Sequence, residues 1–109
     1  MTDINALETS VLGWAAERGI LANSTASQQF LKLVSEMGEL ADNIAKGRDT
    51  RDDIGDCMVV LTIIARLMGT SLNECLSTAW EDIKARKGYL NDIGVFIKES
   101  DNPQLSLGM

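Results

Sequence analysis

The chain contains no histidine, and histidine is the side chain that serves most often as a general base and as an imidazole ligand. Its absence excludes the Ser-His-Asp and Cys-His nucleophile systems. The chemistry that this sequence supports must therefore rest on its carboxylates. There are 16 of them, against 10 lysine and arginine residues.

Basic residues are too few for a protein that holds the backbone of a nucleic acid. The formal net charge is −6, which is the wrong sign for binding through counterion release. We therefore expect no nucleic-acid polymer among the partners. A small polyphosphate remains compatible with this charge, because a divalent cation can bridge carboxylates and phosphates.

Cysteine and long apolar runs are also scarce. Cys57 and Cys75 are the only thiols, and both fall in helical patterns beside apolar residues, so we expect both to be free and to fill the core. The longest apolar stretch is interrupted by Thr62 and Arg66, and no signal-peptide pattern opens the chain. These features predict a soluble cytoplasmic protein that does not enter a membrane.

The helix start and end signals of the sequence predict an all-α fold, a four-to-five-helix bundle. Glycine recurs where helices should end, and residues typical of helix starts follow it, including the capping-box pairs Thr25 with Gln28 and Ser71 with Glu74. We expect helices at about 3–18, 26–46, 50–68 and 72–87. A short extended piece is possible at 95–97. The length of 109 residues suits one domain, 1–99, followed by a flexible tail, 100–109.

The second and third expected helices carry contrasting patterns. In the second, apolar residues at spacings of three and four predict the core face: Phe30, Val34, Met37, Ala41 and Ile44. A polar stripe that borders this face includes Glu36, Glu39 and Asn43. The third helix is apolar almost all the way round after Asp56, so we expect a second subunit to cover part of it, in a homodimer or homotetramer.

One short acidic phrase occurs twice, as Glu36-Met37-Gly38-Glu39 and as Asp53-Ile54-Gly55-Asp56. Residues three apart lie on one face of a helix, and the short connection between the two helices should make them antiparallel neighbours. Four converging carboxylates suit a hard cation: Mg²⁺, with Mn²⁺ also possible. The alternative is a solvated acidic face, which leaves the repulsion unrelieved and both interior glycines unexplained.

Basic and aromatic residues supply further candidates for substrate binding. Five are candidate phosphate contacts: Lys32, Lys46, Lys84, Arg86 and Lys87. Arg86 continues the apolar series of the fourth helix, where it would pair either with a phosphate or with a carboxylate. Aromatic residues at helical spacing are usually core residues, but they also provide platforms for a base. The candidates are Trp14, Trp80, Phe30, Tyr89 and Phe96, of which we take Trp80 as a substrate contact.

The two acidic phrases resemble the E-x-x-E and E/D-x-x-D motifs of the MazG-like family of all-α nucleoside triphosphate pyrophosphohydrolases. The likeness extends through 30–40 and 54–61, which are similar to that family's two metal helices. The segments 79–88 and 94–99 are similar to the ending of its small single-domain members, including phage-encoded ones. Two positions depart from the family pattern, because Ser35 stands where another Glu is frequent and Asp53 is shorter than the common Glu.

The resemblance implies hydrolysis of a nucleoside or deoxynucleoside triphosphate to the monophosphate and pyrophosphate. It also implies Mg²⁺ and a homodimer or a dimer of dimers. We interpret all four carboxylates as metal ligands and catalytic groups, with Glu39 or Glu36 orienting the attacking water. Two alternatives stay open. One is a non-catalytic oligomeric helical module that binds metal, nucleotide or a protein, and the other is a diphosphohydrolase acting on a different pyrophosphate-linked substrate.

Overall fold

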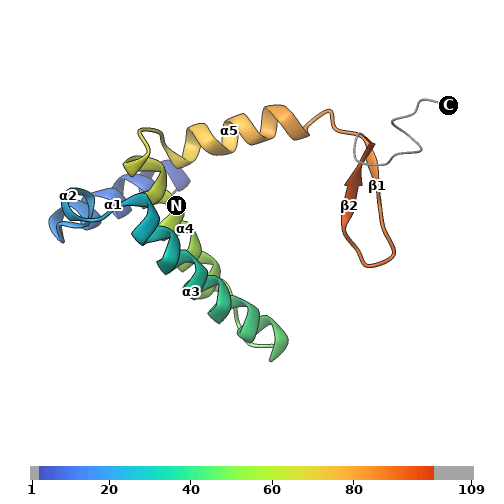
Figure 1. Ribbon diagram of the computed structural model, residues 1–109, viewed down its shortest axis with the longest axis horizontal. Helices are drawn as coiled ribbons and strands as arrows, with labels where there is room; N and C mark the ends of the chain where they lie inside the picture. Colours follow the sequence, from blue (N-terminus) through green and yellow to red (C-terminus); the bar gives the residue numbers. More distant parts are fainter. Residues whose placement is uncertain (1–2, 100–109) are drawn as a thin grey trace. The chain divides into compact units, whose positions relative to one another are not determined.

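The computed structural model describes residues 3–99, which form five helices and one β-hairpin (Figure 1). The elements are α1 (Ile4–Glu17), α2 (Ile20–Asn23), α3 (Ala26–Ala45), α4 (Arg51–Leu67), α5 (Leu72–Ile83), β1 (Gly88–Leu90) and β2 (Phe96–Lys98). The all-α bundle that the sequence predicts is confirmed, with α2 and β1 as additions, and the extended piece expected at 95–97 corresponds to β2. The tail predicted for 100–109 lies outside the described residues.

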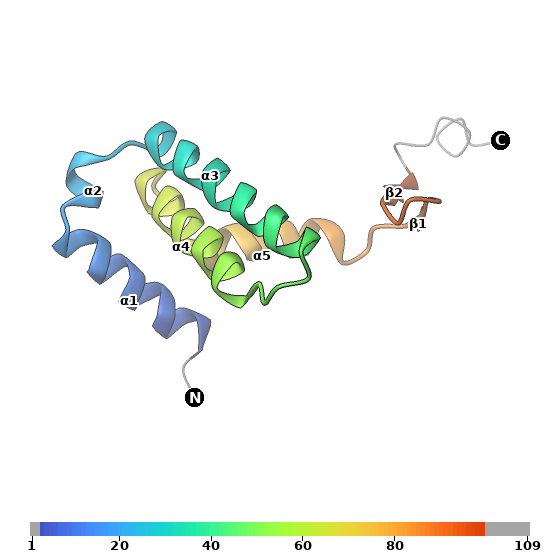
Figure 2. The same cartoon turned by 90° about the horizontal axis from the view of Figure 1, so that it is seen from below.

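The chain divides into two compact units, Met1–Cys75 and Leu76–Met109. In the first unit, α3 and α4 lie side by side and antiparallel, as Figures 1 and 2 both show. Helix α1 contacts α4, and α2 contacts both α1 and α4. The α3–α4 pair thus forms the frame of this unit.

Local signals fix the ends of α3 and the start of α4. The Gln28 amide donates to Thr25 Oγ1 at 3.1 Å and the Thr25 amide donates to Gln28 Oε1 at 3.0 Å, which completes the predicted capping box. After α3, Gly47 adopts φ +69°, a left-handed conformation that reverses the chain. Asp49 Oδ1 then accepts from the Arg51 amide at 3.0 Å where α4 begins. This short turn makes the two helices antiparallel.

The core of the first unit is small and centred between α3 and α4. Leu33, Cys57 and Val60 are buried together, and Leu40 and Ile64 pack against them. Burial raises the pKa of the Cys57 thiol, which behaves as the expected apolar filler. A core of this size leaves much apolar surface uncovered, as expected for a short chain.

The predicted core face of α3 is wrong. Phe30, Val34, Met37 and Ile44 are between 52% and 63% exposed, whereas the row that faces α4 contains Leu33, Glu36 and Leu40. Helix α3 carries two neighbouring apolar rows, and the three-and-four spacing fits either of them. The row with Leu33 is the one that packs against Cys57 and Val60 of α4. We call the exposed row Phe30, Val34, Met37 and Ile44 the outer stripe.

In the second unit the helix ends earlier than predicted. Helix α5 stops at Ile83 rather than near residue 87, so Arg86 no longer continues its apolar series. Strands β1 and β2 pair antiparallel with Gly88 opposite Lys98. A Cβ at Gly88 would lie 2.1 Å from the Ile97 carbonyl oxygen, so this glycine serves the hairpin rather than a helix end.

Two further expectations concern the surface. Cys75, predicted in the core, is exposed on α5, because no α5 residue is buried. Among residues 3–99, no single helix has both the length and the apolar composition of a membrane span, and only α4 and α5 taken together as a bent pair meet both conditions.

Candidate metal centre

Three of the four predicted carboxylates meet between α3 and α4. One oxygen each from Glu36, Glu39 and Asp56 lies within 4.8 Å of the other two. Ligand oxygens on opposite sides of a Mg²⁺ ion are about 4.2 Å apart, so this spread is close to that of a coordination sphere. The i,i+3 spacing on α3 and the antiparallel α4 bring them together as the sequence predicts.

The fourth carboxylate, Asp53, is buried one turn before Asp56 on α4 and is held by an amide. Asn43 Nδ2 donates to Asp53 Oδ2 at 2.9 Å. Asp53 is not one of the three carboxylates that converge. Asn43 was visible in the sequence as a member of the polar stripe of α3, four residues after Glu39, but its partner on the next helix was not.

Glu36 is the most deeply placed carboxylate of the cluster, with 7% of the residue exposed. Lys32 Nζ lies 3.0 Å from Glu36 Oε1, an i,i+4 ion pair along α3. The second oxygen, Oε2, is buried and has no hydrogen-bond partner among residues 3–99. Leaving a buried acceptor unpaired costs about 1–3 kcal/mol, and more for a charged group. A cation at this oxygen would remove that cost, so the residues present fit a metal.

The pKa values of the cluster also indicate that a cation would fit there. The negative charge of Glu36 is the main cause that raises the pKa of Glu39. The pKa of Asp56 is raised chiefly by burial and then by the charges of Asp52 and Glu36. The hydrogen bond to Glu36 raises the pKa of the Lys32 ammonium. Protonation is disfavoured once a divalent cation binds, because the cation reverses the sign of the local potential.

No protein-family model matches the chain. Over 68 residues, 61% of the chain, it is 40% identical to an uncharacterized 18.2 kDa protein from the rep-hol intergenic region of Haemophilus phage HP1. That match covers 42% of the phage protein, so the chain spans less than half the length of this relative.

A solved structure resembles nearly the whole chain. It is the MazG-like pyrophosphohydrolase of cyanophage S-2L, described with bound dGDP and three catalytic Mn²⁺ ions per active site. The TM-score is 0.66, at 19% identity, over 90% of this chain and 98% of that one. This chain has the MazG-like fold. The resemblance that the motifs predict is thus confirmed for the fold, and both relatives are phage proteins.

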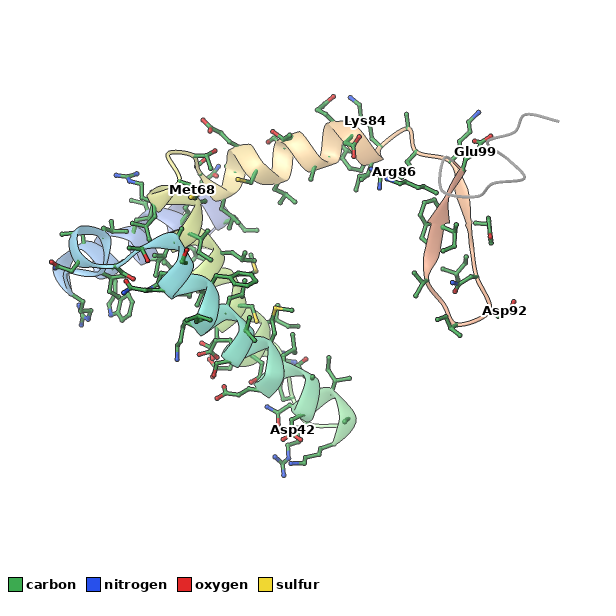
Figure 3. All side chains as sticks on the ribbon, in the orientation of Figure 1. Asp42, Met68, Lys84, Arg86, Asp92 and Glu99 are labelled. Carbon is green, nitrogen blue, oxygen red and sulfur yellow. The ribbon has the colours of Figure 1, made fainter. Side chains whose placement is uncertain are left out.

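The basic residues predicted as phosphate contacts lie in different parts of the structure. Lys32 lies at the carboxylate cluster. Lys46 instead pairs with Asp42 at 2.7 Å near the end of α3, where Figure 3 labels Asp42. Both lysines belong to the first unit, but only Lys32 contacts a residue of the cluster.

The remaining candidates belong to the second unit. Lys84 pairs with Glu81 at 2.6 Å and Arg86 pairs with Asp82, and Figure 3 labels both basic residues near the end of α5. Lys87 follows in the connection to β1, and Trp80 is 56% exposed on α5. These local ion pairs do not need a substrate, so a role of these residues in binding one stays a prediction.

Helix α1 adds residues beside the cluster that the sequence did not assign to it. A hollow of about 370 Å³ is lined by Ser10, Val11 and Trp14 of α1 and by Asp56 and Val59 of α4. Trp14 is therefore the candidate aromatic platform that shares a hollow with a cluster carboxylate. In the sequence, nothing distinguished it from the other aromatic residues, because the α1–α4 contact is a tertiary one.

Proposed function

We propose that this chain hydrolyses nucleoside or deoxynucleoside triphosphates to the monophosphate and pyrophosphate, using Mg²⁺ or Mn²⁺. The observation that carries the proposal is the convergence of Glu36, Glu39 and Asp56 around one point, with a buried Glu36 oxygen that has no partner in the described chain. The MazG-like fold supports the reaction class. The dGDP and Mn²⁺ described for the cyanophage protein support a nucleotide and a divalent cation.

Glu36, Glu39 and Asp56 would hold one or two ions, with Asp53 as a fourth ligand or as a neighbour that Asn43 keeps in place. Such ions would neutralise phosphate charge and lower the pKa of a bound water. Glu39 is the exposed member of the three, and Lys32 already engages Glu36. We therefore assign to Glu39 the acceptance of the proton from the attacking water.

The bond changes of the proposed reaction are those of a phosphoanhydride hydrolysis. The water oxygen forms a bond to the α-phosphorus, and the bond from that phosphorus to the oxygen that bridges to the β-phosphorus breaks. Pyrophosphate leaves with the electron pair. Lys32 lies where it would stabilise phosphate charge, and Lys46, Lys84, Arg86 and Lys87 are proposed as further phosphate contacts on the grounds of their charge.

We also propose that the active form is a homodimer or homotetramer, held by the outer stripe of α3. A groove of about 590 Å³ beside it is lined by Phe30 and Leu31 of α3 and by Ile64 and Met68 at the end of α4, among others. Exposed apolar patches of this kind mark protein interfaces. A single sedimenting species with the mass of one chain at micromolar concentration would contradict this proposal.

The reaction is tested by incubating the purified chain with each ribo- and deoxyribonucleoside triphosphate plus Mg²⁺ or Mn²⁺. The released phosphate is then identified by ³¹P NMR. Pyrophosphate is the expected product. Orthophosphate would indicate a different cleavage. If the chain left triphosphates intact but hydrolysed other pyrophosphate-linked substrates, it would be a diphosphohydrolase. Asp42→Asn is the matched control for variants of the cluster, because it removes an exposed charge from the same helix.

A second candidate function is a non-catalytic helical module that binds metal, nucleotide or a partner protein. The observation that favours it is the amount of apolar surface left exposed on α3 and α5, including Leu31, Leu76 and Trp80. It predicts metal binding without turnover of any triphosphate. Calorimetric titration with Mn²⁺ alongside the hydrolysis assay separates the two functions.

A further inference from the structure

An apolar cavity of about 230 Å³ lies between α1 and α4 and reaches Leu72, the first residue of α5. Most of its lining is aliphatic. Val11 and Val59 line this cavity and also the hollow that contains Asp56, so the two spaces adjoin. The cavity is therefore separated by these shared side chains from a hollow that one carboxylate of the cluster, Asp56, lines.

Gly55 forms part of the cavity wall and directly precedes Asp56. Glycine inside a helix is less stable than alanine, so its presence calls for a reason. A Cβ built at Gly55 meets no atom within 4 Å, so packing in the chain does not require glycine here. The missing side chain leaves space for a ligand beside Asp56.

Glu8 is the charged residue of the cavity lining. Its Oε1 accepts from the Leu72 amide at 3.2 Å, which caps the start of α5. Its second carboxylate oxygen, Oε2, can accept a hydrogen bond from a ligand. The Thr62 hydroxyl, also in the lining, donates to the Met58 carbonyl at 2.7 Å and so offers the cavity lone pairs only. The polar side chains of the cavity thus accept hydrogen bonds and do not donate them.

We propose that this cavity holds the nucleobase of the substrate and that Glu8 makes it selective for guanine. This inference rests on the proposed function. The aliphatic walls receive the two faces of the ring, and the flat wall at Gly55 lets the base lie next to the metal centre. Guanine presents two adjacent donors, N1–H and the 2-amino group, on one edge. Adenine and cytosine present one amino group, and thymine presents one N–H between two oxygens that a carboxylate repels.

The test of Glu8 compares kcat/KM for the four deoxynucleoside triphosphates in wild type and Glu8→Gln. Glutamine keeps an oxygen for the Leu72 amide but places an NH₂ group where Oε2 was. We expect the preference for dGTP over dTTP to fall by about 10- to 100-fold, with an unchanged melting temperature. Equal base ratios in the two proteins would overturn the assignment.

Gly55→Ala tests the cavity independently. A methyl group in the wall should weaken nucleotide affinity by about 10-fold or more, while the melting temperature stays the same or rises. Gly13→Ala is the matched control, because Gly13 lies inside α1 with open space around its Cβ but is not part of the cavity lining. Unchanged affinity in Gly55→Ala would overturn the placement of the base.

Binding measurements keep this inference apart from the reaction itself. Should wild type hydrolyse no triphosphate, the proposed function fails, and calorimetry with dGMP and dTMP in the absence of metal then decides. A preference for dGMP that Glu8→Gln loses supports the cavity as a guanine site. Equal binding of the two monophosphates, or none, rejects it.

Discussion

The two acidic phrases share one spacing, but their buried carboxylates, Asp53 and Glu36, have different partners. On α4, buried Asp53 accepts a hydrogen bond from the neutral amide of Asn43. On α3, buried Glu36 has one oxygen paired with Lys32 and the other left without a partner in the described chain. The chain thus supplies a hydrogen-bond donor to Asp53, whereas one buried oxygen of Glu36 stays free, within residues 3–99, to accept a bound group.

The second carboxylates of the two phrases, Glu39 and Asp56, differ as well. Glu39 owes its raised pKa chiefly to the charge of Glu36, while Asp56 owes its raised pKa chiefly to burial. The charge of Glu36 thus helps to raise the pKa of both groups, and Asp56 is the group for which ionisation in the absence of a cation costs solvation. Variants at these positions test whether the two helices play unequal roles.

The largest effect is expected for Glu36→Gln. Glutamine retains the shape but removes the charge and one of the oxygens proposed to bind the metal, so kcat/KM for pyrophosphate release should fall by more than about 1000-fold. Glu39→Gln and Asp56→Asn should show the same loss. Melting temperatures in EDTA should stay level or rise, since each substitution relieves repulsion between like charges.

The control for these variants is Asp42→Asn, which should retain full turnover. If Glu36→Gln kept wild-type turnover at saturating Mg²⁺, the role of Glu36 as a metal ligand would be refuted. If Asp42→Asn lost turnover as well, the effect would be one of overall charge rather than of the cluster.

A smaller effect is expected for Asn43→Ala, which releases Asp53 without touching the three converging carboxylates. Groups that orient metal ligands typically contribute 10- to 100-fold to metal affinity or activity. We expect a loss in that range in Mn²⁺ affinity, measured by calorimetry, with kcat partly restored at high metal concentration. An affinity equal to that of wild type would mean that Asp53 takes no part in the metal site.

The pH dependence of stability sharpens the comparison further. The folded-state pKa values of Glu39 and Asp56 are raised, so these groups favour the fold most below their ordinary pKa values of 4.5 and 3.8. Their contribution is lost as pH rises through the raised values. In EDTA, the melting temperature of wild type relative to Asp56→Asn should therefore decrease as the pH rises above about 4. With Mn²⁺ the trend should reverse, because the ion binds the ionised carboxylates. A difference that does not change with pH or metal would contradict this account.

Local rules explain how much of this fold was predictable. The capping box at Thr25, the turn at Gly47 and the i,i+3 acidic pairs each depend on residues close in sequence, and together they predict the antiparallel α3–α4 pair and the convergence of Glu36, Glu39 and Asp56. These features need only helix geometry and a short connection.

The features that the sequence could not predict depend on contacts between helices. Helix α3 offers two apolar rows, and only its contact with α4 decides that Leu33 is buried while Val34 is exposed. The hydrogen bond from Asn43 to Asp53 and the placement of Glu8 against Leu72 likewise join residues on different helices. Periodicity marks a face of a helix but does not identify its neighbour.

The smallest effects are expected at Lys32, which separates a structural ion pair from a functional one. Lys32 is exposed, and its pair with Glu36 runs along one helix, so Lys32→Gln should move the melting temperature by no more than about 2 °C. If Lys32 also stabilises phosphate charge, kcat/KM should fall by about 10-fold, and Lys32→Arg should restore most of it. Loss of stability without loss of activity would make the pair structural only. In that case the unpaired oxygen of Glu36, rather than its paired one, would carry the whole difference between the two acidic phrases.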